Sequence, residues 1–238
     1  MVIGAIFAGG IGSRMGSADM PKQYLQLGSK PIIVHTIEKF VVNPGIDRII
    51  VLCPKAWIAH TKDLVKKYLG EAIAEKINVV EGGSTRNGTL ENALKFINEN
   101  FAIDDDSVIV THDAVRPFVT HRIIDENIEA AKKYGACVIP ATDTIVRSED
   151  SENVSSIPTR SELYQGQTPQ SFRIKELESV LNSLTEDEKN TLTDACKIYT
   201  IKNKPVRIVD GEVFNIKITY TYDLKVANAL LGVVNNDK

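Results

Sequence analysis

The chain has 238 residues, of which 43% are hydrophobic and 25% charged, proportions that are typical of a folded globular protein and exclude disordered and fibrous classes. The 28 Lys and Arg residues nearly balance the 31 Asp and Glu residues, giving a formal net charge of −3. We therefore expect a single domain over residues 1–238, with no broad basic surface for nucleic acid or an anionic membrane.

Short apolar, β-branched runs alternate along the chain with helix-length amphipathic segments, as in a mainly parallel sheet covered by helices. The predicted strands are residues 2–7, 48–52, 77–80, 107–111, 136–139 and 206–209. The predicted helices are residues 31–42, 57–69, 85–100, 120–134, 175–184, 192–201 and 222–231. The sequence therefore predicts a Rossmann-like, three-layer α/β fold.

Residues 141–168 interrupt this alternation. The segment is polar, rich in Thr, Ser, Asp and Arg, and has no helical period. A stretch of this length inside a compact domain is usually functional or disordered. Because residues 144–147 and 154–157 have a strand-like composition, we expect a β-arm that projects from the domain.

Membrane insertion and secretion are not expected. No apolar stretch approaches the roughly 18 to 20 residues of a bilayer span. The apolar start at residues 1–8 is too short for a signal peptide and lacks its basic residues. Cys53, Cys137 and Cys196 are widely spaced and form no Cys-x-x-Cys motif. We expect three buried structural thiols and a cytoplasmic protein.

The first predicted strand leads into a glycine-rich loop at residues 8–16. Glycines allow a backbone to approach a ligand closely and to direct N–H groups at phosphates. The spacing of Gly10, Gly12 and Gly16 is one residue longer than the dinucleotide fingerprint, and no Gly-Lys-Ser/Thr follows as in a Walker A motif. The loop therefore indicates a phosphate site of another kind, with a simple tight turn as the alternative.

Two cations accompany this loop. Arg14 lies within it and Lys22 follows it, at the carboxyl end of a predicted parallel strand, where α/β sheets bind ligands. Most Lys and Arg residues are solvated surface charges, and that is the alternative for both. Together they suit a polyphosphate, because both can stabilise negative charge that grows on a transferring phosphoryl group.

Five segments, in order, resemble the signature of the cytidylyltransferases that act on polyol phosphates. That family includes the methylerythritol-phosphate and ribitol-5-phosphate cytidylyltransferases. The segments are residues 8–16 with 21–24, 82–87, 111–117, 165–172 and 215–219. The resemblance covers essentially the whole chain. It implies a nucleotidyltransferase fold and an enzyme that transfers a cytidylyl group from CTP to a polyol phosphate, releasing pyrophosphate.

The resemblance also implies a role for each matching residue. The catalytic cations would be Arg14, Lys22, Arg160 and Lys217. The CTP-binding residues would be Phe7, Ala8, Gly9, Gly10, Gly12, Glu81, Gly82, Gly83, Ser84, Thr85, Arg86, Asn87 and Thr89. The acceptor would contact Arg160, Lys217, Thr144, Thr168 and Thr193. Asp113 would bind Mg²⁺, the cofactor that nucleotidyl transfer normally requires.

Simpler interpretations remain for some of these positions. Ser84 or Thr85 could be only the N-cap of the helix predicted over residues 85–100. The family often has an acidic residue where this chain has Ser84. Asp113 could be a turn or cap residue at the end of its strand, and we interpret the neighbouring His112 as a structural histidine.

A projecting arm has to pack somewhere, and a two-fold partner is the commonest solution. In the family that this chain resembles, the arm reaches across a dimer, and its arginine grips the acceptor phosphate in the neighbouring site. By resemblance we therefore expect a homodimer with composite active sites, in which Arg160 serves the partner.

The acceptor implied by the closest resemblance is D-ribitol 5-phosphate, as in the enzymes of teichoic-acid synthesis. The supporting segments are residues 157–168, 192–197 and 223–229, together with Val115, where the methylerythritol branch more often has alanine. The alternative acceptor is methylerythritol phosphate. A nucleotide-binding regulatory module without catalytic activity is the non-enzyme alternative, because fold does not imply function.

Overall fold

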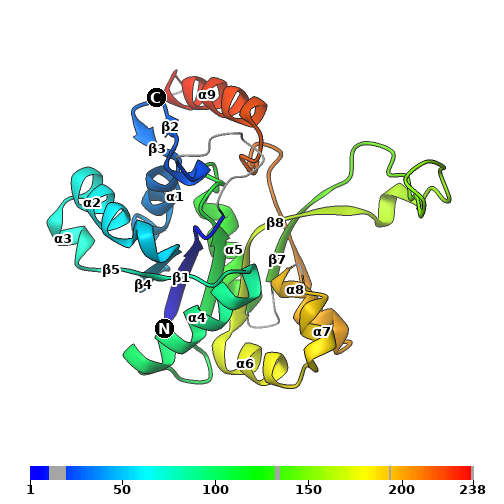
Figure 1. The fold of residues 1–238 in the computed structure, drawn as a ribbon, viewed down its shortest axis with the longest axis horizontal. Coiled ribbons are helices and arrows are strands. Elements are labelled where there is room, and N and C mark those ends of the chain that lie inside the picture. The colour runs from blue at the N-terminus through cyan, green and yellow to red at the C-terminus, as the bar shows by residue number, and fades with distance from the viewer. Residues whose placement is uncertain (11–19, 132–134, 193, 237–238) are drawn as a thin grey trace.

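The computed structural model describes residues 1–10, 20–131, 135–192 and 194–236. Its centre is a seven-stranded sheet (Figure 1). From edge to edge the strands are β5 (Ile77–Glu81), β4 (Arg48–Cys53), β1 (Val2–Phe7), β6 (Val108–Asp113), β8 (Tyr164–Arg173), β7 (Gly135–Pro140) and β9 (Arg207–Asp210). All run in one direction except β8, which is antiparallel to both of its neighbours. The predicted α/β fold with a mainly parallel sheet is confirmed.

Helices cover both faces of this sheet. On one face lie α1 (Ile32–Val41), α2 (Ile58–Leu69), α3 (Glu71–Ala74) and α5 (His121–Ala130). On the other lie α4 (Arg86–Asn100), α6 (Ile174–Asn182) and α8 (Ala195–Ile201). The short α7 (Glu186–Asn190) connects the last two, and α9 (Thr221–Asn236) packs through Ala227 near the start of α1. The arrangement has three layers.

Strand β1 lies inside the sheet and is buried on both faces. Ile3 and Phe7 pack into the core under α4, while Ile6 packs into the core under α1. A side chain at Gly4 would collide with this packing, because its Cβ would lie 2.6 Å from Cδ1 of Phe40 on α1. Glycine therefore lets α1 pack directly against the strand that leads to the candidate site.

Several element boundaries differ from the sequence prediction. The helix predicted over residues 120–134 ends at Ala130, and the helix predicted over 192–201 begins at Ala195, with Asp194 as its N-cap. The sequence did not predict the strands β2 (Gln26–Leu27) and β3 (Lys30–Pro31), the turns η2 (Lys22–Tyr24), η3 (Lys55–Trp57) and η5 (Arg160–Glu162), or α3 and α7. The largest omission is β8, which lies inside the sheet between β6 and β7.

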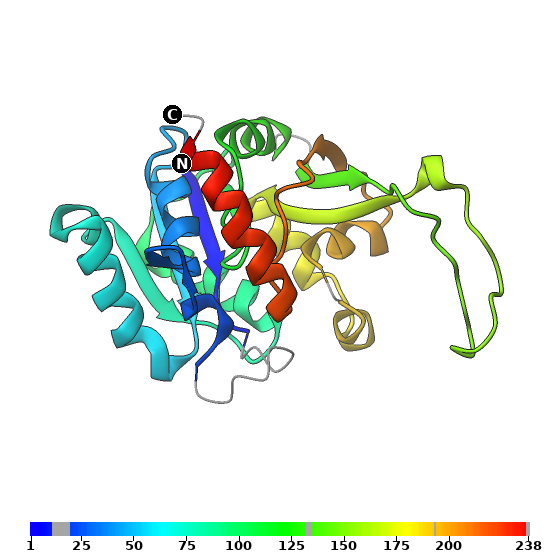
Figure 2. The ribbon, with the colours of Figure 1, turned by 90° about the horizontal axis from the view of Figure 1, so that it is seen from above.

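Strands β7 and β8 form one hairpin, and the arm is the connection between them. Pro140 pairs with Tyr164, and residues 141–163 project from the sheet beyond that pair (Figures 1 and 2). Residues 164–168, which we expected in the arm, belong to β8. The strand-like segments 144–147 and 154–157 meet at one bridge, between Arg147 and Ser156.

The structure also bears on the expectations that the chain has no membrane span and that its cysteines are buried thiols. Among the residues that the structure describes, no helix is both long enough and apolar enough to cross a bilayer. Cys53 is buried and Cys196 half-buried, and both are free thiols. Burial raises the pKa of each thiol, which keeps it protonated and unreactive near neutral pH. The side chain of Cys137 lies outside the described part of the structure.

Candidate active site

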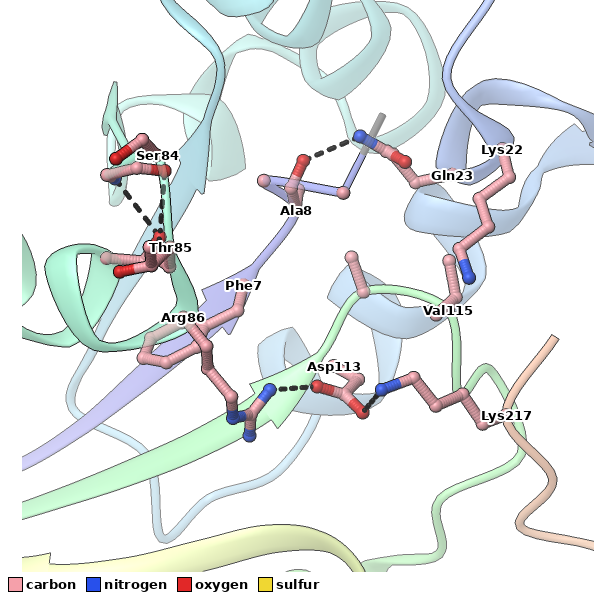
Figure 3. Close-up of a pocket in the computed structure, with 15 residues that line it drawn as sticks. Phe7, Ala8, Lys22, Gln23, Ser84, Thr85, Arg86, Asp113, Val115 and Lys217 are labelled. Carbon is pink, nitrogen blue, oxygen red and sulfur yellow. Dashed lines mark hydrogen bonds and ion pairs between the residues drawn. The ribbon is translucent and has the colours of Figure 1, made fainter. Parts of the chain in front are cut away.

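A cavity of about 280 Å³ opens at the carboxyl ends of β1 and β6 (Figure 3). Ligands of open α/β sheets bind at this edge, because loops and helix N-termini converge there. The lining residues are Phe7, Ala8, Gly9, Gly10, Lys22, Gln23, Gly83, Ser84, Thr85, Arg86, Thr89, Asp113, Ala114, Val115 and Lys217. The structure therefore brings the described start of the glycine-rich loop, residues 8–10, together with segments from four other parts of the chain.

The backbone on two sides of the cavity is fixed by hydrogen bonds. Ala8, which follows β1, donates its N–H to the carbonyl of Leu52 at 2.7 Å and accepts from Nε2 of Gln23 at 2.6 Å. On the opposite side, a Cβ at Gly83 would lie 2.3 Å from the carbonyl carbon of Gly88. The chain can turn this tightly into α4 only with glycine at that position.

Helix α4 points its N-terminus at the cavity. Thr85 is its N-cap, and the hydroxyl of this residue accepts a hydrogen bond from the N–H of Gly88 at 3.0 Å. This agrees with the simpler interpretation of Thr85, and the same residue also lines the cavity. The first N–H groups of a helix have no partner within the helix, so they can donate hydrogen bonds to a ligand at this point.

Asp113, at the end of β6, is surrounded by three cations. Its carboxylate is hydrogen-bonded to Nη1 of Arg86 and lies 2.9 Å from Nζ of Lys217 (Figure 3). The same carboxylate lies 3.5 Å from Nε of Arg116. Burial alone would raise the pKa of Asp113, but these charges outweigh burial and hold it well below its ordinary value. Asp113 is therefore ionised, and an excess of positive charge faces the cavity.

A buried hydrogen-bond network supports Asp113 from behind. The hydroxyl of Thr168 accepts from the N–H of Asp113 at 3.1 Å and lies 2.9 Å from Nδ1 of His112. Nε2 of His112 lies 3.0 Å from the carbonyl of Arg116, which can only accept, so Nε2 carries the proton. Arg116 in turn donates from Nη1 to the carbonyl of Asn215 at 2.8 Å. The orientation of Asp113 is fixed by groups from four segments.

His112 is structural, as we interpreted it from the sequence. It is fully buried, and burial lowers its pKa to about 4. The imidazole is therefore neutral at physiological pH, with one nitrogen donating and the other accepting. It does not face the cavity as a general acid or base.

Lys22 approaches the cavity from the side opposite α4. It begins the turn η2, and its side chain extends toward Val115 (Figure 3). Gln23, the next residue, is buried and joins this turn to the loop after β1 through its bond to Ala8. The sequence did not single out Gln23, Ala114 or Val115 as ligand-contacting residues, although all three lie inside or beside the recognised motifs.

Some predicted site residues lie elsewhere. Glu81, Gly82 and Asn87 are next to the cavity-lining residues but do not line it, and Asn87 instead bonds to carbonyls before α8, at Lys189 and Leu192. Thr168 is buried behind Asp113 rather than exposed to the cavity.

Of the remaining predicted site residues, two lie on the arm and three fall outside the described part of the chain. Arg160 and Thr144 are exposed on the arm, and neither lines the cavity of its own chain. The guanidinium of Arg160 donates to the carbonyl of Thr142 at 3.3 Å. Gly12, Arg14 and Thr193 lie outside the residues that the structure describes.

The described side chains offer few ligands to a metal. Within this part of the chain there is no group of three or more His, Cys, Asp or Glu side chains that could hold an ion. Mg²⁺, however, often binds one or two protein carboxylates and takes its remaining ligands from substrate phosphates and water. Asp113 is ionised and lines the cavity, so it fits an ion that arrives with a nucleotide.

Known proteins with similar sequence or structure agree on one family. Residues 2–233 match the family model described as IspD, 2-C-methyl-D-erythritol 4-phosphate cytidylyltransferase. The 4-diphosphocytidyl-2C-methyl-D-erythritol synthase of Anaerococcus prevotii is 29% identical, with a TM-score of 0.78 over 97% of this chain and 96% of that chain. The 2-C-methyl-D-erythritol 4-phosphate cytidylyltransferase of Francisella tularensis is 28% identical, with a TM-score of 0.77 over 96% of this chain and 99% of that chain.

Proposed function

The chain belongs to the IspD family of cytidylyltransferases, and we propose that its reaction is CTP plus D-ribitol 5-phosphate giving CDP-ribitol and pyrophosphate. The observation that carries cytidylyl transfer is the convergence of Lys22, Arg86 and Lys217 on one cavity beside an ionised Asp113. Cations fixed in a cavity at the end of a parallel sheet suit the phosphates of a nucleotide.

In the proposed step, an oxygen of the acceptor phosphate attacks the α-phosphorus of CTP. A new P–O bond forms as the bond between the α-phosphorus and the bridging oxygen breaks, and pyrophosphate leaves. No covalent enzyme intermediate is involved. Catalysis consists of holding the two phosphates in line and stabilising the negative charge that develops, which is the usual division of labour in phosphoryl transfer.

The lining residues suggest a division of the cavity. The N-terminus of α4, with Ser84 and Thr85, offers small polar groups and N–H donors to the cytosine and ribose, as the family resemblance implies. Lys22 and Lys217, on the other side, would neutralise the α-phosphate and the acceptor phosphate (Figure 3). The side chain of Lys217 is 44% exposed, so a phosphate in the cavity can reach it.

Mg²⁺ would be held by Asp113 together with phosphate oxygens of CTP, and it would neutralise charge on the leaving pyrophosphate. Exchange of Asp113 for Asn keeps the shape of this residue and removes its charge. We expect the Mg²⁺ concentration for half-maximal activity to rise about tenfold or more. An unchanged Mg²⁺ titration at unchanged maximal rate would leave Asp113 with a structural role alone.

Val115 supports a linear acceptor. Its side chain lines the cavity near Lys22 (Figure 3), where alanine would leave more room. D-ribitol 5-phosphate has an unbranched carbon chain, whereas methylerythritol phosphate has a methyl branch that needs this additional space. Methylerythritol phosphate is the second candidate, because the solved relatives at 28% and 29% identity carry that acceptor or its cytidylyl product in their names.

The arm supports a homodimer in which each site contains residues from both subunits. Ile145, Val146, Val154 and Ile157 are all exposed on the arm. Apolar side chains in such numbers on a projecting segment indicate a partner that buries them, and a second copy of the chain is the simplest one. The Arg160 guanidinium would then bind the acceptor phosphate in the partner's cavity by paired hydrogen bonds.

One assay tests this proposal. Pyrophosphate release from CTP is followed with D-ribitol 5-phosphate or methylerythritol phosphate as acceptor, in the native protein and in Val115→Ala. We expect kcat/KM to favour ribitol phosphate in the native protein and to shift toward methylerythritol phosphate by about tenfold in the variant. A preference for methylerythritol phosphate in the native protein would identify the second candidate. Absence of release with every polyol phosphate would favour a regulatory module.

A further inference from the structure

Lys22 belongs to a turn of three residues, η2, whose other two members are buried. Gln23 is 1% exposed and Tyr24 is 3% exposed. Gln23 joins the turn to the loop after β1 through its hydrogen bond to the carbonyl of Ala8. Tyr24 points the other way, into the first turn of α2. The backbone at Lys22 is therefore held by the two buried residues that follow it, Gln23 and Tyr24.

The ring of Tyr24 occupies an aromatic socket. It stacks on Trp57, with ring centroids 4.6 Å apart and planes inclined by 15°. His60 closes the socket edge-on, at 5.2 Å from Tyr24 and 5.3 Å from Trp57. Trp57 and His60 come from η3 and α2, so the stack joins the Lys22 turn to the segment after β4. Aromatic pairs in such geometries stabilise a contact beyond simple burial.

A chain of hydrogen bonds fixes how deep the ring sits. The hydroxyl of Tyr24 lies 2.8 Å from Oγ1 of Thr61, and this Oγ1 donates to the carbonyl of Trp57 at 2.8 Å. Because Thr61 has a single hydroxyl proton, Tyr24 is the donor to Thr61. Burial raises the pKa of Tyr24, so the phenol keeps the proton that it donates. Stack and hydrogen bond together define one position for the ring.

The hydrogen bonds of the short turn couple the position of the Tyr24 ring to the backbone of Lys22. The carbonyl of Lys22 accepts from the N–H of Leu25 at 3.1 Å, and the N–H of Tyr24 donates to the carbonyl of Pro21 at 3.0 Å. The backbone of Lys22 therefore cannot rotate without moving the ring of Tyr24. We propose that Tyr24, seated against Trp57 and Thr61, is a positioning residue that fixes Lys22 in the nucleotide cavity, an inference that rests on the proposed role of that lysine.

A double-mutant cycle tests whether Tyr24 acts through Lys22. Tyr24→Leu fills the socket without the stack or the hydroxyl, and it is made in the native protein and in Lys22→Ala. CTP affinity is measured by calorimetry in the presence of Mg²⁺, and kcat and KM by pyrophosphate release. The matched control is Tyr68→Leu, at a half-buried tyrosine near the C-terminal end of α2. Trp57 is the single tryptophan of the chain, so its fluorescence reports the socket directly.

We expect Tyr24→Leu to alter Trp57 emission and to lower kcat/KM about tenfold when Lys22 is present, but less than about twofold when it is absent. Tyr68→Leu should have the same small effect in both backgrounds. An equal loss in both backgrounds from Tyr24→Leu would overturn the inference, because the residue would then act on the fold alone.

Two further results keep the inference and the proposed function separate. If Tyr24→Leu does not fold, Tyr24→Phe removes only the hydrogen bond to Thr61, and Thr61→Val removes it together with the bond from Thr61 to the carbonyl of Trp57. The same cycle with either variant should give a coupling of about twofold to threefold. Additive effects in those variants would overturn the inference. Native protein that does not bind CTP would contradict the proposed function itself, and the inference with it. CTP binding together with an additive cycle would contradict the inference alone.

Discussion

Side chains around the cavity are held by contacts from distant parts of the chain, whereas those of the arm have few contacts of any kind. Asp113 is 5% exposed and is bonded by Arg86, Lys217 and the hydroxyl of Thr168. Ile157 on the arm is 63% exposed. A preorganised cavity can stabilise a charged transition state without reorganisation, while the arm would gain further contacts only from the proposed dimer partner. The two regions are therefore expected to respond differently to mutation.

The arm is not without local order. Its tip is closed by Asp150, whose carboxylate accepts from the N–H groups of Glu152 and Asn153 at 2.9 and 2.8 Å. These hydrogen bonds lower the pKa of Asp150, which therefore remains ionised. They are exposed and local, unlike the buried bonds behind Asp113. Local order at the tip fixes its shape, and the proposed dimer partner would supply contacts to the rest of the arm.

The largest effect is expected in the cavity, from Lys22→Ala. Loss of a preorganised cation beside the reacting phosphates should lower turnover by about 10² to 10³. The fold should remain intact, because the buried anchors of this turn are Gln23 and Tyr24. Steady-state pyrophosphate release and thermal unfolding measure the two consequences.

Lys55→Ala, at an exposed lysine of η3, is the matched control and should have near-native turnover. A folded Lys22→Ala protein with near-native turnover would remove the distinction between cavity and surface lysines. Arg14→Ala, at a position outside the described residues, is expected to resemble Lys22→Ala.

The next effect concerns the arm. Arg160→Ala should raise the KM for the acceptor by about 10 to 10², since a guanidinium binds phosphate by paired, charge-assisted hydrogen bonds. CTP affinity should change little. Acceptor and CTP titrations of the same variant separate the two.

Mixing Arg160→Ala protein with Lys22→Ala protein tests whether the sites are composite. Each heterodimer then contains one site with an intact Lys22 from one subunit and an intact Arg160 from the other. Part of the activity should return once the subunits exchange. Proven exchange with no return of activity would assign the arm to its own chain.

A smaller effect follows from the buried His112. The unfolded chain protonates this imidazole near its ordinary pKa of about 6.5, whereas the folded protein does so only near a pKa of about 4. The unfolded state therefore binds more protons within that window, and the unfolding free energy falls as the pH drops. Between pH 7 and pH 5 the loss is about 2 kcal/mol.

Denaturant unfolding at both pH values, for the native protein and for His112→Gln, measures this contribution. The variant has no imidazole at this position, so its unfolding free energy should depend less on pH over that range. Equal slopes for both proteins would show that His112 titrates alike in the folded and unfolded states.

The smallest effect is expected at the tip of the arm. Replacing residues 148–153 with a short Gly-Ser linker should change kcat and KM by less than about twofold, because this segment is polar and exposed. A loss comparable to that of Arg160→Ala would mean that the tip itself reaches the partner's cavity. The same acceptor titration distinguishes the two results.

The sequence predicted most of the sheet because covered strands are continuous apolar runs. Residues 49–53 of β4 are all buried, and so are all six residues of β6. Strand β8 could not be recognised in this way, because it contains Gly166, Gln167 and Pro169. Several of its polar side chains find their partners only in the folded state, as when Nδ2 of Asn215 donates to Oε1 of Gln167 at 3.0 Å. No local signal could replace those distant partners.

The candidate site was predictable to a similar extent. Lys22 and Asp113 belong to recognised sequence motifs, and a cation and a carboxylate at these positions already indicate phosphate and metal binding. Arg116 and Gln23 were not assigned a role, since their roles depend on bonds to residues 99 and 15 positions away in the chain. Such contacts are set by tertiary packing, which periodicity and composition do not reveal.

The pairing of Pro140 with Tyr164 has a consequence for the evolution and engineering of this fold. The hydrogen-bonded ladder continues one step further, from the N–H of Ala141 to the carbonyl of Leu163 at 2.9 Å. The two ends of the arm thus enter and leave at adjacent positions, as in an ordinary hairpin turn. Insertions and deletions between them leave the strand register unchanged, so the length of the arm can change without disturbing the sheet. A chain with residues 142–162 replaced by a tight turn is the natural starting point for an isolated, armless scaffold.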